Sequence, residues 1–259
     1  MRTIQVIGIG SGDPDHLTLQ AVAAMNRVDV FFTIDKGAAK TDLSALRTEL
    51  LARHVTRPHR IVEAPDPRRD RAAEAYEAAV VDWQDRREAL YERMIADELD
   101  DDGCGGFLVW GDPALYDGTL RILDRIAARG EVAFDVVSIP GISSVQALAA
   151  AHRLILNRIG RAFTVTTGRR LAEGGFPADA DDVVVMLDAR HAYAGLPDTD
   201  LDIYWGAYVG SADEVLVRGD LQQVKDEIRR VWTRERERKG WIMDTYLLRR
   251  RVPEPDGAA

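Results

Sequence analysis

Short apolar runs alternate with segments of helical periodicity along the first half of this chain. The runs that predict strands cover residues 3–9, 29–34, 107–110 and 132–139. The segments that predict helices cover residues 17–28, 72–99 and 120–129. Because alternating strands and helices are typical of parallel sheets with crossover connections, the pattern predicts an α/β fold.

The second half of the chain continues this alternation after a Pro-Gly pair. Its predicted strands cover residues 163–167, 183–187, 203–209, 215–218 and 241–248, and its predicted helices cover residues 145–152 and 221–238. Because Pro140-Gly141 turns the chain, it predicts a boundary between an N-terminal domain of residues 1–139 and a C-terminal domain of residues 140–259. We expect the charged end of the last strand to cover a sheet edge.

Composition narrows the possible function classes. The formal net charge of −9 over 259 residues argues against nucleic acid as a partner, because nonspecific binding needs a basic face. The one cysteine, Cys104, excludes an internal disulfide framework and a cysteine-cluster metal site. No apolar run approaches the roughly 18 residues of a membrane span. We therefore expect no membrane partner and a cytoplasmic location.

The first of three glycine-containing turns is GIGSGDP, at residues 8–14. Its third glycine comes one residue earlier than in the usual dinucleotide-binding spacing, and Asp-Pro follows. The alternative to a Rossmann site is a tight turn in which glycine supplies unusual backbone angles. Open α/β sheets bind small molecules at the carboxyl edge of their strands, where such a turn lies.

The second turn, GDPALYDGT at residues 111–119, combines several features of a ligand site. Gly111 allows a ligand to approach the backbone closely, and Asp112 can accept hydrogen bonds from a ribose or an amine. The alternative role for Asp112 is a cap on the helix that begins near Thr119.

The third turn, PGISS at residues 140–144, places two serines where one is enough to cap the next helix. Together and in this order, the three turns resemble those of the tetrapyrrole (corrin/porphyrin) methylases, which use S-adenosylmethionine. The resemblance covers essentially the whole chain. Ser11 stands where many members have proline, which implies that the first turn faces the ring substrate rather than the cofactor.

Within that family, the chain is most similar to the branch that converts precorrin-5 to precorrin-6A on the oxygen-dependent route to cobalamin. The segments that carry this narrower resemblance are TIDKG at 33–37, residues 76–83, WGDPALYD at 110–117 and GWIMD at 240–244. It implies methylation at carbon 1 with loss of acetate. It also implies two α/β domains that face each other across a cofactor cleft, a homodimer, a small-molecule tetrapyrrole substrate and S-adenosylhomocysteine as product.

The resemblance implies two groups of cofactor-binding residues, carried over position by position. In the first group, Gly111, Asp112 and Leu115 are expected to contact the methionine and ribose portions. Ser143 and Ser144, in the third turn, are expected to lie near the cofactor. The group expected on the adenine side is Met186, Leu187, Tyr208, Val209, Trp241 and Ile242.

The chemistry needs few reactive groups. Methyl transfer from a sulfonium requires alignment and exclusion of water but no metal. The loss of acetate requires an activated water and donors for a developing oxyanion. Asp35, after the second predicted strand, is the candidate base or substrate-orienting carboxylate, with a solvated turn residue as the alternative. Tyr116 is a candidate hydrogen-bond donor to cofactor or substrate, with core packing as the alternative.

The substrate carries many carboxylates, which arginine binds in bidentate fashion. The candidate partners are Arg68, Arg69, Arg71, Arg249, Arg250 and Arg251, with a solvated helix face or chain end as the alternative. Two other functions remain open at this point. One is a methyltransferase of the same fold that acts on another precorrin, on ribosomal RNA or on a protein amino acid. The other is a nucleotide-binding α/β module without chemistry.

Overall fold

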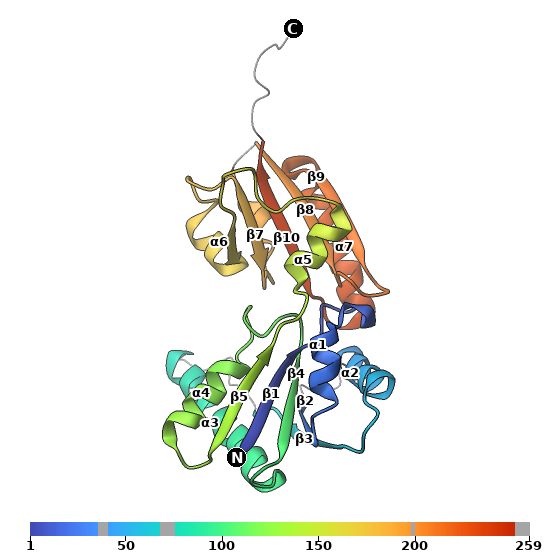
Figure 1. The fold of residues 1–259 in the computed structure, drawn as a ribbon. Coiled ribbons are helices and arrows are strands. Elements are labelled where there is room, and N and C mark those ends of the chain that lie inside the picture. The colour runs from blue at the N-terminus through green and yellow to red at the C-terminus, as the bar shows by residue number, and fades with distance from the viewer. Residues whose placement is uncertain (36–40, 68–75, 198–199, 252–259) are drawn as a thin grey trace. The chain divides into compact units, whose positions relative to one another are not determined.

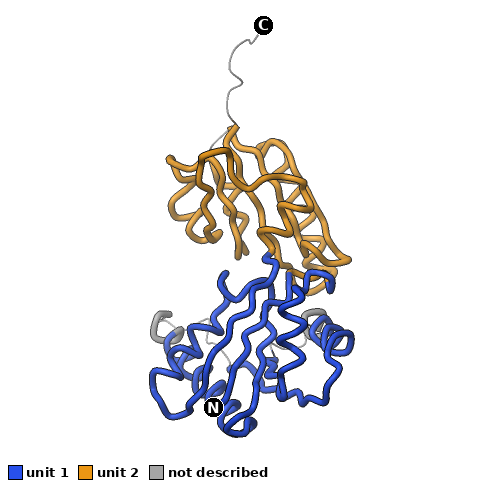
Figure 2. The backbone as a smooth tube through the Cα atoms, in the orientation of Figure 1, with its two compact units in different colours: residues 1–10, 14–143 blue, residues 11–13, 144–259 orange. Residues whose placement is uncertain are grey.

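The computed structural model describes residues 1–35, 41–67, 76–197 and 200–251, with backbone alone for 41–44 and 76–80. The chain forms two compact units (Figure 2), of which unit 1 comprises Met1–Gly10 and Pro14–Ser143, and unit 2 comprises Ser11–Asp13 and Ser144–Ala259. The division falls in the same PGISS turn as the boundary predicted from the sequence. It differs from that prediction in grouping residues 140–143 with unit 1 and Ser11–Asp13 with unit 2.

Unit 1 is a doubly wound α/β unit. Its five-stranded sheet has the order β3-β2-β4-β1-β5, with all pairs parallel. The strands are β1 (Arg2–Gly8), β2 (Val30–Asp35), β3 (Arg60–Pro65), β4 (Cys104–Val109) and β5 (Phe134–Ile139). The helices are η1 (Pro14–His16), α1 (Leu19–Met25), α2 (Thr41–His54), α3 (Tyr76–Glu98) and α4 (Thr119–Arg129). Helices α1 and α2 cover one face of the sheet, and α3 and α4 cover the other (Figure 1).

The apolar run of β1 is explained by burial on both of these faces. Ile4 and Val6 pack in the cluster under α3 and α4, whereas Ile7 and Ile9 pack in the cluster under α1 and α2. Side chains alternate between the faces of a strand, so a central parallel strand needs apolar residues at nearly every position. The predicted α/β class is therefore confirmed.

Unit 2 holds a second sheet of mixed direction. Its order is β6-β7-β10-β8-β9, in which only the β6–β7 pair is parallel. The strands are β6 (Thr164–Thr167), β7 (Asp182–Met186), β8 (Leu201–Ala207), β9 (Val215–Asp220) and β10 (Asp244–Arg250). The helices are α5 (Ser144–His152), α6 (Gly168–Gly174), η3 (Ala192–Gly195) and α7 (Leu221–Lys239). Helices α6 and α7 pack on the core cluster that contains the fully buried Trp205 and Tyr246.

The last strand, β10, lies at the centre of this sheet between β7 and β8. Its charged end is accommodated by ion pairs: the Arg249 guanidinium contacts the Asp182 carboxylate, and that of Arg250 lies 2.8 Å from Asp200. A central strand can therefore end in arginines when its neighbours supply the carboxylates.

The sequence pattern did not predict α2, β3 or α6. The predicted helix over 72–99 corresponds to α3, and its residues 72–75 lie outside the described residues. Within the described part of the chain, no helix combines the length and the apolar character needed to cross a membrane.

Candidate functional site

The carboxyl ends of β4, β1 and β5 bring the backbones of the three glycine-containing turns into contact. A Cβ built on Gly8 would lie 2.6 Å from the Gly141 nitrogen, and one built on Gly141 would lie 2.1 Å from the Gly111 carbonyl oxygen. The Gly111 amide also donates to the Gly10 carbonyl at 2.8 Å. The turns can approach each other this closely only with glycine at these positions.

Asp112 joins the second turn to the third. Its Oδ2 accepts the Gly141 N–H at 2.9 Å, and its Oδ1 accepts the Ala114 N–H at 2.8 Å. The helix cap is supplied elsewhere, because the Thr119 N–H donates to Asp117 Oδ1 at 2.8 Å. The alternative role of Asp112 as the cap of α4 is therefore wrong. An ionised carboxylate has further lone pairs with which to accept hydrogen bonds from a ligand.

The other predicted residues of this turn region lie around Asp112 in unit 1. Leu115 is half-buried, and its N–H donates to the Asp112 carbonyl at 3.2 Å. Ser143 is buried, and its Cα lies 3.7 Å from where a Cβ on Gly111 would stand. Tyr116 is 47% exposed, which does not fit the alternative of core packing.

The first turn has the geometry of the non-Rossmann alternative. Gly10 and Gly12 have φ of 82° and 142°, and a short 3₁₀ turn rather than an α-helix follows. Helix α1 begins at Leu19, with the Thr18 hydroxyl accepting the Ala21 N–H at 3.0 Å. Glycine here supplies backbone angles that L-residues rarely adopt.

Asp35 ends β2 at the same carboxyl edge of the sheet, and its side chain is exposed. It pairs with Pro65 of β3, whereas pairing with β4 ends earlier, at Phe32 and Phe107. Lys36 and Gly37 of the TIDKG segment lie outside the described residues. The strand order thus places Asp35 on the strand next to the one that carries the Gly111 turn.

In unit 2, three segments far apart in the sequence meet at one edge of the sheet. Thr245 pairs with Met186 and Asp244 pairs with Ala207, so the ends of β7 and β8 flank the start of β10. The predicted residues at this edge are Met186, Leu187, Tyr208, Val209, Trp241 and Ile242. The Ser144 hydroxyl at the start of α5 lies 3.2 Å from that of Thr245, which joins it to the same edge.

Tyr208 holds the segment before β10 in place. Its hydroxyl donates to the Trp241 carbonyl at 2.6 Å, and its N–H donates to the Met243 carbonyl at 2.9 Å. Burial raises the pKa of Tyr208, and the Lys239 ammonium 5.1 Å from the ring centroid opposes that change. Val209 beside it is buried as well. The Tyr208 side chain therefore holds the segment before β10 in position, and the Tyr208 backbone forms part of the sheet edge.

Several of the predicted site residues have strained backbone conformations. Five described residues other than glycine have positive φ, namely Tyr116, Arg153, Leu187, His191 and Tyr208. Three of these are among the site residues predicted from the sequence, with φ of 54° at Tyr116, 56° at Leu187 and 50° at Tyr208. Backbone strain of this kind tends to cluster at functional sites. The strain therefore supports these positions independently of any resemblance.

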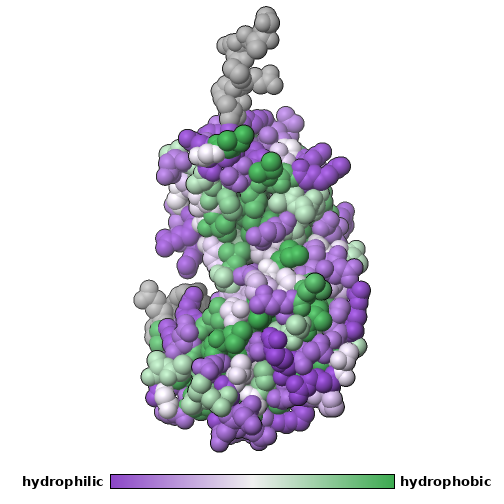
Figure 3. Space-filling model, in the orientation of Figure 1, coloured by the Kyte–Doolittle hydropathy of each residue, from purple (hydrophilic) through white to green (hydrophobic). Residues whose placement is uncertain are grey.

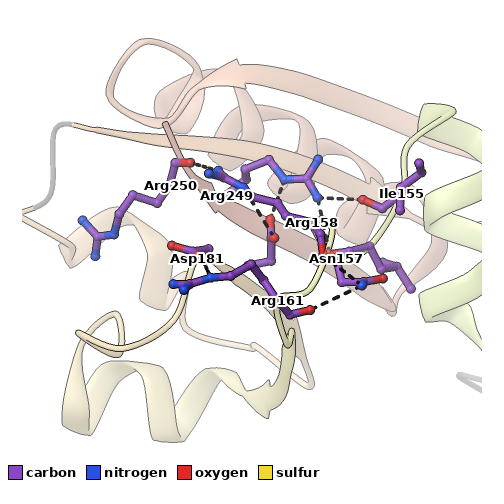
Figure 4. A network of polar contacts seen from close by, with 9 residues as sticks. Ile155, Asn157, Arg158, Arg161, Asp181, Arg249 and Arg250 are labelled. Atoms are coloured by element: carbon purple, nitrogen blue, oxygen red, sulfur yellow. Dashed lines mark hydrogen bonds and ion pairs between the residues drawn. The ribbon is translucent and has the colours of Figure 1, made fainter. Parts of the chain in front are cut away.

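Figure 4 shows where two of the arginines predicted to bind substrate carboxylates lie. Arg249 pairs with the fully buried Asp182, and Arg250 is part of the same network. Both stand at the end of β10 opposite to its start at Asp244, and so away from the predicted adenine-side residues. The prediction that they bind substrate carboxylates is therefore not supported by their placement.

Of the remaining arginine candidates, the structure describes one, which lies beside an acidic residue. Arg251 lies 2.6 Å from Asp220. Arg68, Arg69 and Arg71 lie outside the described residues. Among the described residues, no group of three or more histidine, cysteine or acidic side chains is placed to hold a metal ion.

Sequence reasoning missed a buried carboxyl group behind the edge in unit 2. Trp205 Nε1 donates to Asp244 Oδ2 at 2.9 Å, and burial raises the pKa of Asp244 to about 7. The neighbouring Asp188 accepts the Tyr246 hydroxyl at 2.7 Å. The only sequence signal was an aspartate that directly precedes the apolar residues of the last strand.

Comparison with known proteins agrees with these features. The family model of the Tetrapyrrole (Corrin/Porphyrin) Methylases matches residues 3–225. A precorrin-6A synthase (deacetylating) from Sinorhizobium sp is 48% identical over 251 residues, which cover 96% of each chain. The crystal structure of a cobalamin synthesis related protein (CobF) from Corynebacterium diphtheriae is 38% identical, with a TM-score of 0.84 over 97% of this chain and 100% of that one.

A more distant structure shares the fold. It is a uroporphyrin-III C-methyltransferase from Thermus thermophilus complexed with S-adenosylhomocysteine, 19% identical with a TM-score of 0.57 over 95% of this chain and 91% of that one. The family match spans most of the chain, from β1 through β9, and ends within α7. The chain therefore belongs to the tetrapyrrole (corrin/porphyrin) methylases, which are S-adenosylmethionine-dependent methyltransferases.

Proposed function

We propose that the protein methylates precorrin-5 at carbon 1 and releases the extruded acetyl group as acetate, giving precorrin-6A. The observation that carries this proposal is the 48% identity to a precorrin-6A synthase (deacetylating) over 96% of both chains. The CobF structure, at 38% identity over the full length of that chain, supports the same branch of the family. Another precorrin as methyl acceptor is the alternative outcome.

In unit 1, we propose that the Gly111 turn receives the methionine and ribose portions of the cofactor. Gly111 is buried and has φ of 70°, and a Cβ there would meet no atom closer than 3.7 Å, so the space beside its Cα is free of close contacts. The Asp112 carboxylate can accept ribose hydroxyls while it holds the Gly141 N–H. Leu115 and Ser143 flank this position.

In unit 2, we propose that the adenine contacts the edge formed by β7, β8 and the start of β10. Leu187 is 63% exposed and Met186 is half-buried, so this edge offers apolar surface beside backbone polar groups. That combination suits a flat heteroaromatic ring. Ser144, Tyr208, Val209, Trp241 and Ile242 complete the proposed set. S-adenosylmethionine, when bound, supplies a methyl group already activated on a sulfonium.

The residues of the chain then have two tasks. For the methyl transfer they align the acceptor carbon and exclude water, which requires position rather than acid–base chemistry. For the loss of acetate, we propose that the exposed Asp35 carboxylate takes a proton from water as the water oxygen bonds to the acetyl carbonyl carbon. Collapse of the resulting oxyanion breaks the bond between the acetyl carbon and the macrocycle, which releases acetic acid and leaves the electron pair on the macrocycle. The half-exposed Tyr116 hydroxyl is the proposed donor to the developing oxyanion.

The decisive experiment incubates the protein with precorrin-5 and methyl-labelled S-adenosylmethionine. We expect one labelled methyl group at carbon 1 and one acetate for each precorrin-6A formed. Label on a different precorrin, or no acetate, would contradict the proposal. Asp35→Asn should keep the affinity for S-adenosylhomocysteine and lose acetate release, whereas Glu63→Gln, an exposed acid on the next strand, should change neither. Full turnover by folded Asp35→Asn would remove Asp35 from the mechanism.

We also propose that the enzyme is a homodimer. On the face drawn in Figure 3, apolar side chains appear in patches interrupted by hydrophilic ones. The exposed apolar residues include Ile155 and Ile159, 75% and 103% exposed, in the segment that joins α5 to β6. Contiguous exposed apolar patches commonly mark contact surfaces. Sedimentation should give a dimer for the wild type and a monomer for Ile159→Asp, and a monomeric wild type would refute the proposal.

A cytoplasmic location is proposed on the supply of the cofactor, because cells make S-adenosylmethionine in the cytoplasm. The single cysteine also suits a reducing compartment. Fractionation of cells that produce the protein should recover it with cytoplasmic enzymes, and recovery with membranes would contradict this location.

A further inference from the structure

Asp188 is a buried carboxylate that directly follows Leu187, the strained residue at the proposed adenine edge. Asp188 is 3% exposed, whereas Leu187 is 63% exposed. The Asp188 carboxylate accepts three hydrogen bonds: Oδ1 from the Arg190 N–H at 3.0 Å, and Oδ2 from the Ala192 N–H and the Tyr246 hydroxyl, each at 2.7 Å. One side chain thus joins the end of β7 to the start of η3 and to the central strand β10.

A glycine beside this carboxylate allows a fourth element to enclose it. Gly168 is the first residue of α6, which directly follows β6, the strand that runs parallel to β7. A Cβ built on Gly168 would lie 2.4 Å from the Asp188 Cβ and Cγ. Any side chain at this position would therefore displace the carboxylate, whereas glycine lets the backbone of α6 pack against it. The carboxylate lies where β7, β10, η3 and α6 meet.

The stability of unit 2 does not explain a carboxylate at this position. Burial of a charged group is costly, and the cost is lowest where a cation compensates it. Among the residues that the structure describes, no arginine, lysine or histidine forms an ion pair with Asp188, and its hydrogen-bond donors are neutral. Burial and, after it, the Asp188 charge also raise the pKa of Asp244 to about 7. By contrast, the buried Asp182 at the other end of β7 pairs with the Arg249 guanidinium.

The hydrogen bonds of Asp188 act on the turn that follows Leu187. The two N–H groups that donate to it lie two and four residues further along the chain, and such bonds from an aspartate to the backbone that follows it fix a turn. Leu187 has φ of 56°, and strained conformations of this kind persist only where the surrounding structure determines them. The Asp188 carboxylate provides that restraint, because it holds the chain after Leu187 against β10.

We propose that Asp188 is a positioning residue for the cofactor, whose carboxylate holds the turn after β7 so that Leu187 faces the adenine. Because Asp188 is buried, it acts through Leu187 rather than by contact with the cofactor. The inference rests on the proposed adenine position and deepens it, since it names the group that keeps this edge in shape. It gives Asp188 no part in the methyl transfer or in the loss of acetate.

Calorimetric binding of S-adenosylhomocysteine to Asp188→Asn tests this role. Asparagine keeps the shape of the side chain but replaces one acceptor oxygen by an NH₂ group, so at least one of the three hydrogen bonds is lost. We expect the Kd to rise about tenfold, the effect of one hydrogen bond lost at a buried group. An Asp188→Asn variant with wild-type affinity would overturn the proposal.

The matched control is Asp182→Asn, which changes a buried aspartate at the opposite end of the same strand. This substitution should lower the Tm as well, because it removes the acid that pairs with Arg249, but it should leave the Kd within about twofold of wild type. An equal loss of affinity in Asp182→Asn and Asp188→Asn would show a general loosening of unit 2 and would also overturn the proposal.

A double-mutant cycle tests whether Asp188 acts through Leu187. Glycine adopts positive φ without strain, so the turn in Leu187→Gly needs less restraint, and adding Asp188→Asn should weaken binding by less than about threefold. The same tenfold loss in both backgrounds would overturn the inference. Wild type that methylates precorrin-5 without these differences between variants would refute the role of Asp188 alone. Wild type that shows the differences but does not methylate precorrin-5 would refute the proposed function alone.

Discussion

Substitution of Asp244 by asparagine should make the protein more stable at neutral and alkaline pH. Asp244 is 9% exposed and stands at the first position of the central strand β10. Its Oδ2 accepts a hydrogen bond from Trp205 Nε1 at 2.9 Å. Asparagine has nearly the same shape and keeps a carbonyl oxygen that can accept this hydrogen bond. The substitution therefore removes the ionisation while leaving the packing in place.

The magnitude follows from the pKa. Burial, with the neighbouring Asp188 carboxylate, raises the pKa of Asp244 from 3.8 to about 7 in the folded state. The folded protein thus holds a proton that the unfolded chain has released, so this group lowers stability as pH rises from about 4 to about 7. The loss is complete above the folded pKa, and a difference of about 3 between the two pKa values corresponds to about 4 kcal/mol as an upper bound. For a unit of this size that is about 15 °C in Tm.

Calorimetric unfolding at pH 5 and pH 8 tests this reasoning. The advantage of Asp244→Asn over wild type should grow by about 3 kcal/mol between the two pH values, because most of the interval between the unfolded and folded pKa lies above pH 5. Asp179→Asn, an exposed aspartate in the same unit, is the control and should show no such growth. An Asp244→Asn difference that is the same at both pH values would refute a proton held by Asp244 in the folded state.

Three further predictions concern the turns and the arginine network. Gly141→Ala should lower the Tm and abolish calorimetric binding of S-adenosylhomocysteine, because its Cβ would stand 2.1 Å from the Gly111 oxygen; binding at wild-type affinity would contradict this. Asp112→Asn should weaken the binding of S-adenosylhomocysteine about tenfold. Asparagine has a single side-chain oxygen, so one of the two backbone N–H groups that now donate to Asp112 would lose its acceptor. Arg249→Gln should lower the free energy of unfolding by about 3 kcal/mol, because it leaves the buried Asp182 without its close partner. The KM of Arg249→Gln for precorrin-5 should not change, and an increase would restore this arginine as a substrate ligand.

How far the sequence predicts the fold depends on burial. Strands such as β1 and β7, with residues buried from both faces, leave continuous apolar runs and were predicted to within two residues. Strand β3 was not predicted, because it lies at a sheet edge and four of its six residues are exposed. The boundary of α4 was predicted at its carboxyl end, where Gly130 has φ of 72° and caps the helix. Glycine at that point is a local signal that needs no knowledge of the rest of the fold.

The site was predictable as a set of turns but not as a set of contacts. The hydrogen bond from Gly141 to Asp112 joins residues from turns that follow β5 and β4, which are separated in the sheet by β1. The order of strands in a sheet is not the order along the chain, so the partner of Asp112 could not be derived from spacing. The same holds for Tyr208, whose hydroxyl finds its acceptor at Trp241 only because β10 inserts between β7 and β8.

Tyr208 and Leu187 of unit 2 both have strained backbone conformations, but only that of Tyr208 is explained by contacts of its own among the described residues. Tyr208 has φ of 50°, and hydrogen bonds from both its N–H and its hydroxyl to the 241–243 segment explain how that conformation is held. Leu187 has φ of 56°, yet its side chain is 63% exposed and packs in no core cluster of the described residues. A non-glycine residue in the left-handed region costs about 1 kcal/mol or more, and such conformations persist where function requires them. Since packing does not account for Leu187, we propose that its strained conformation serves contact with the adenine, so glycine at this position should relieve the backbone while weakening the binding of S-adenosylhomocysteine in calorimetry.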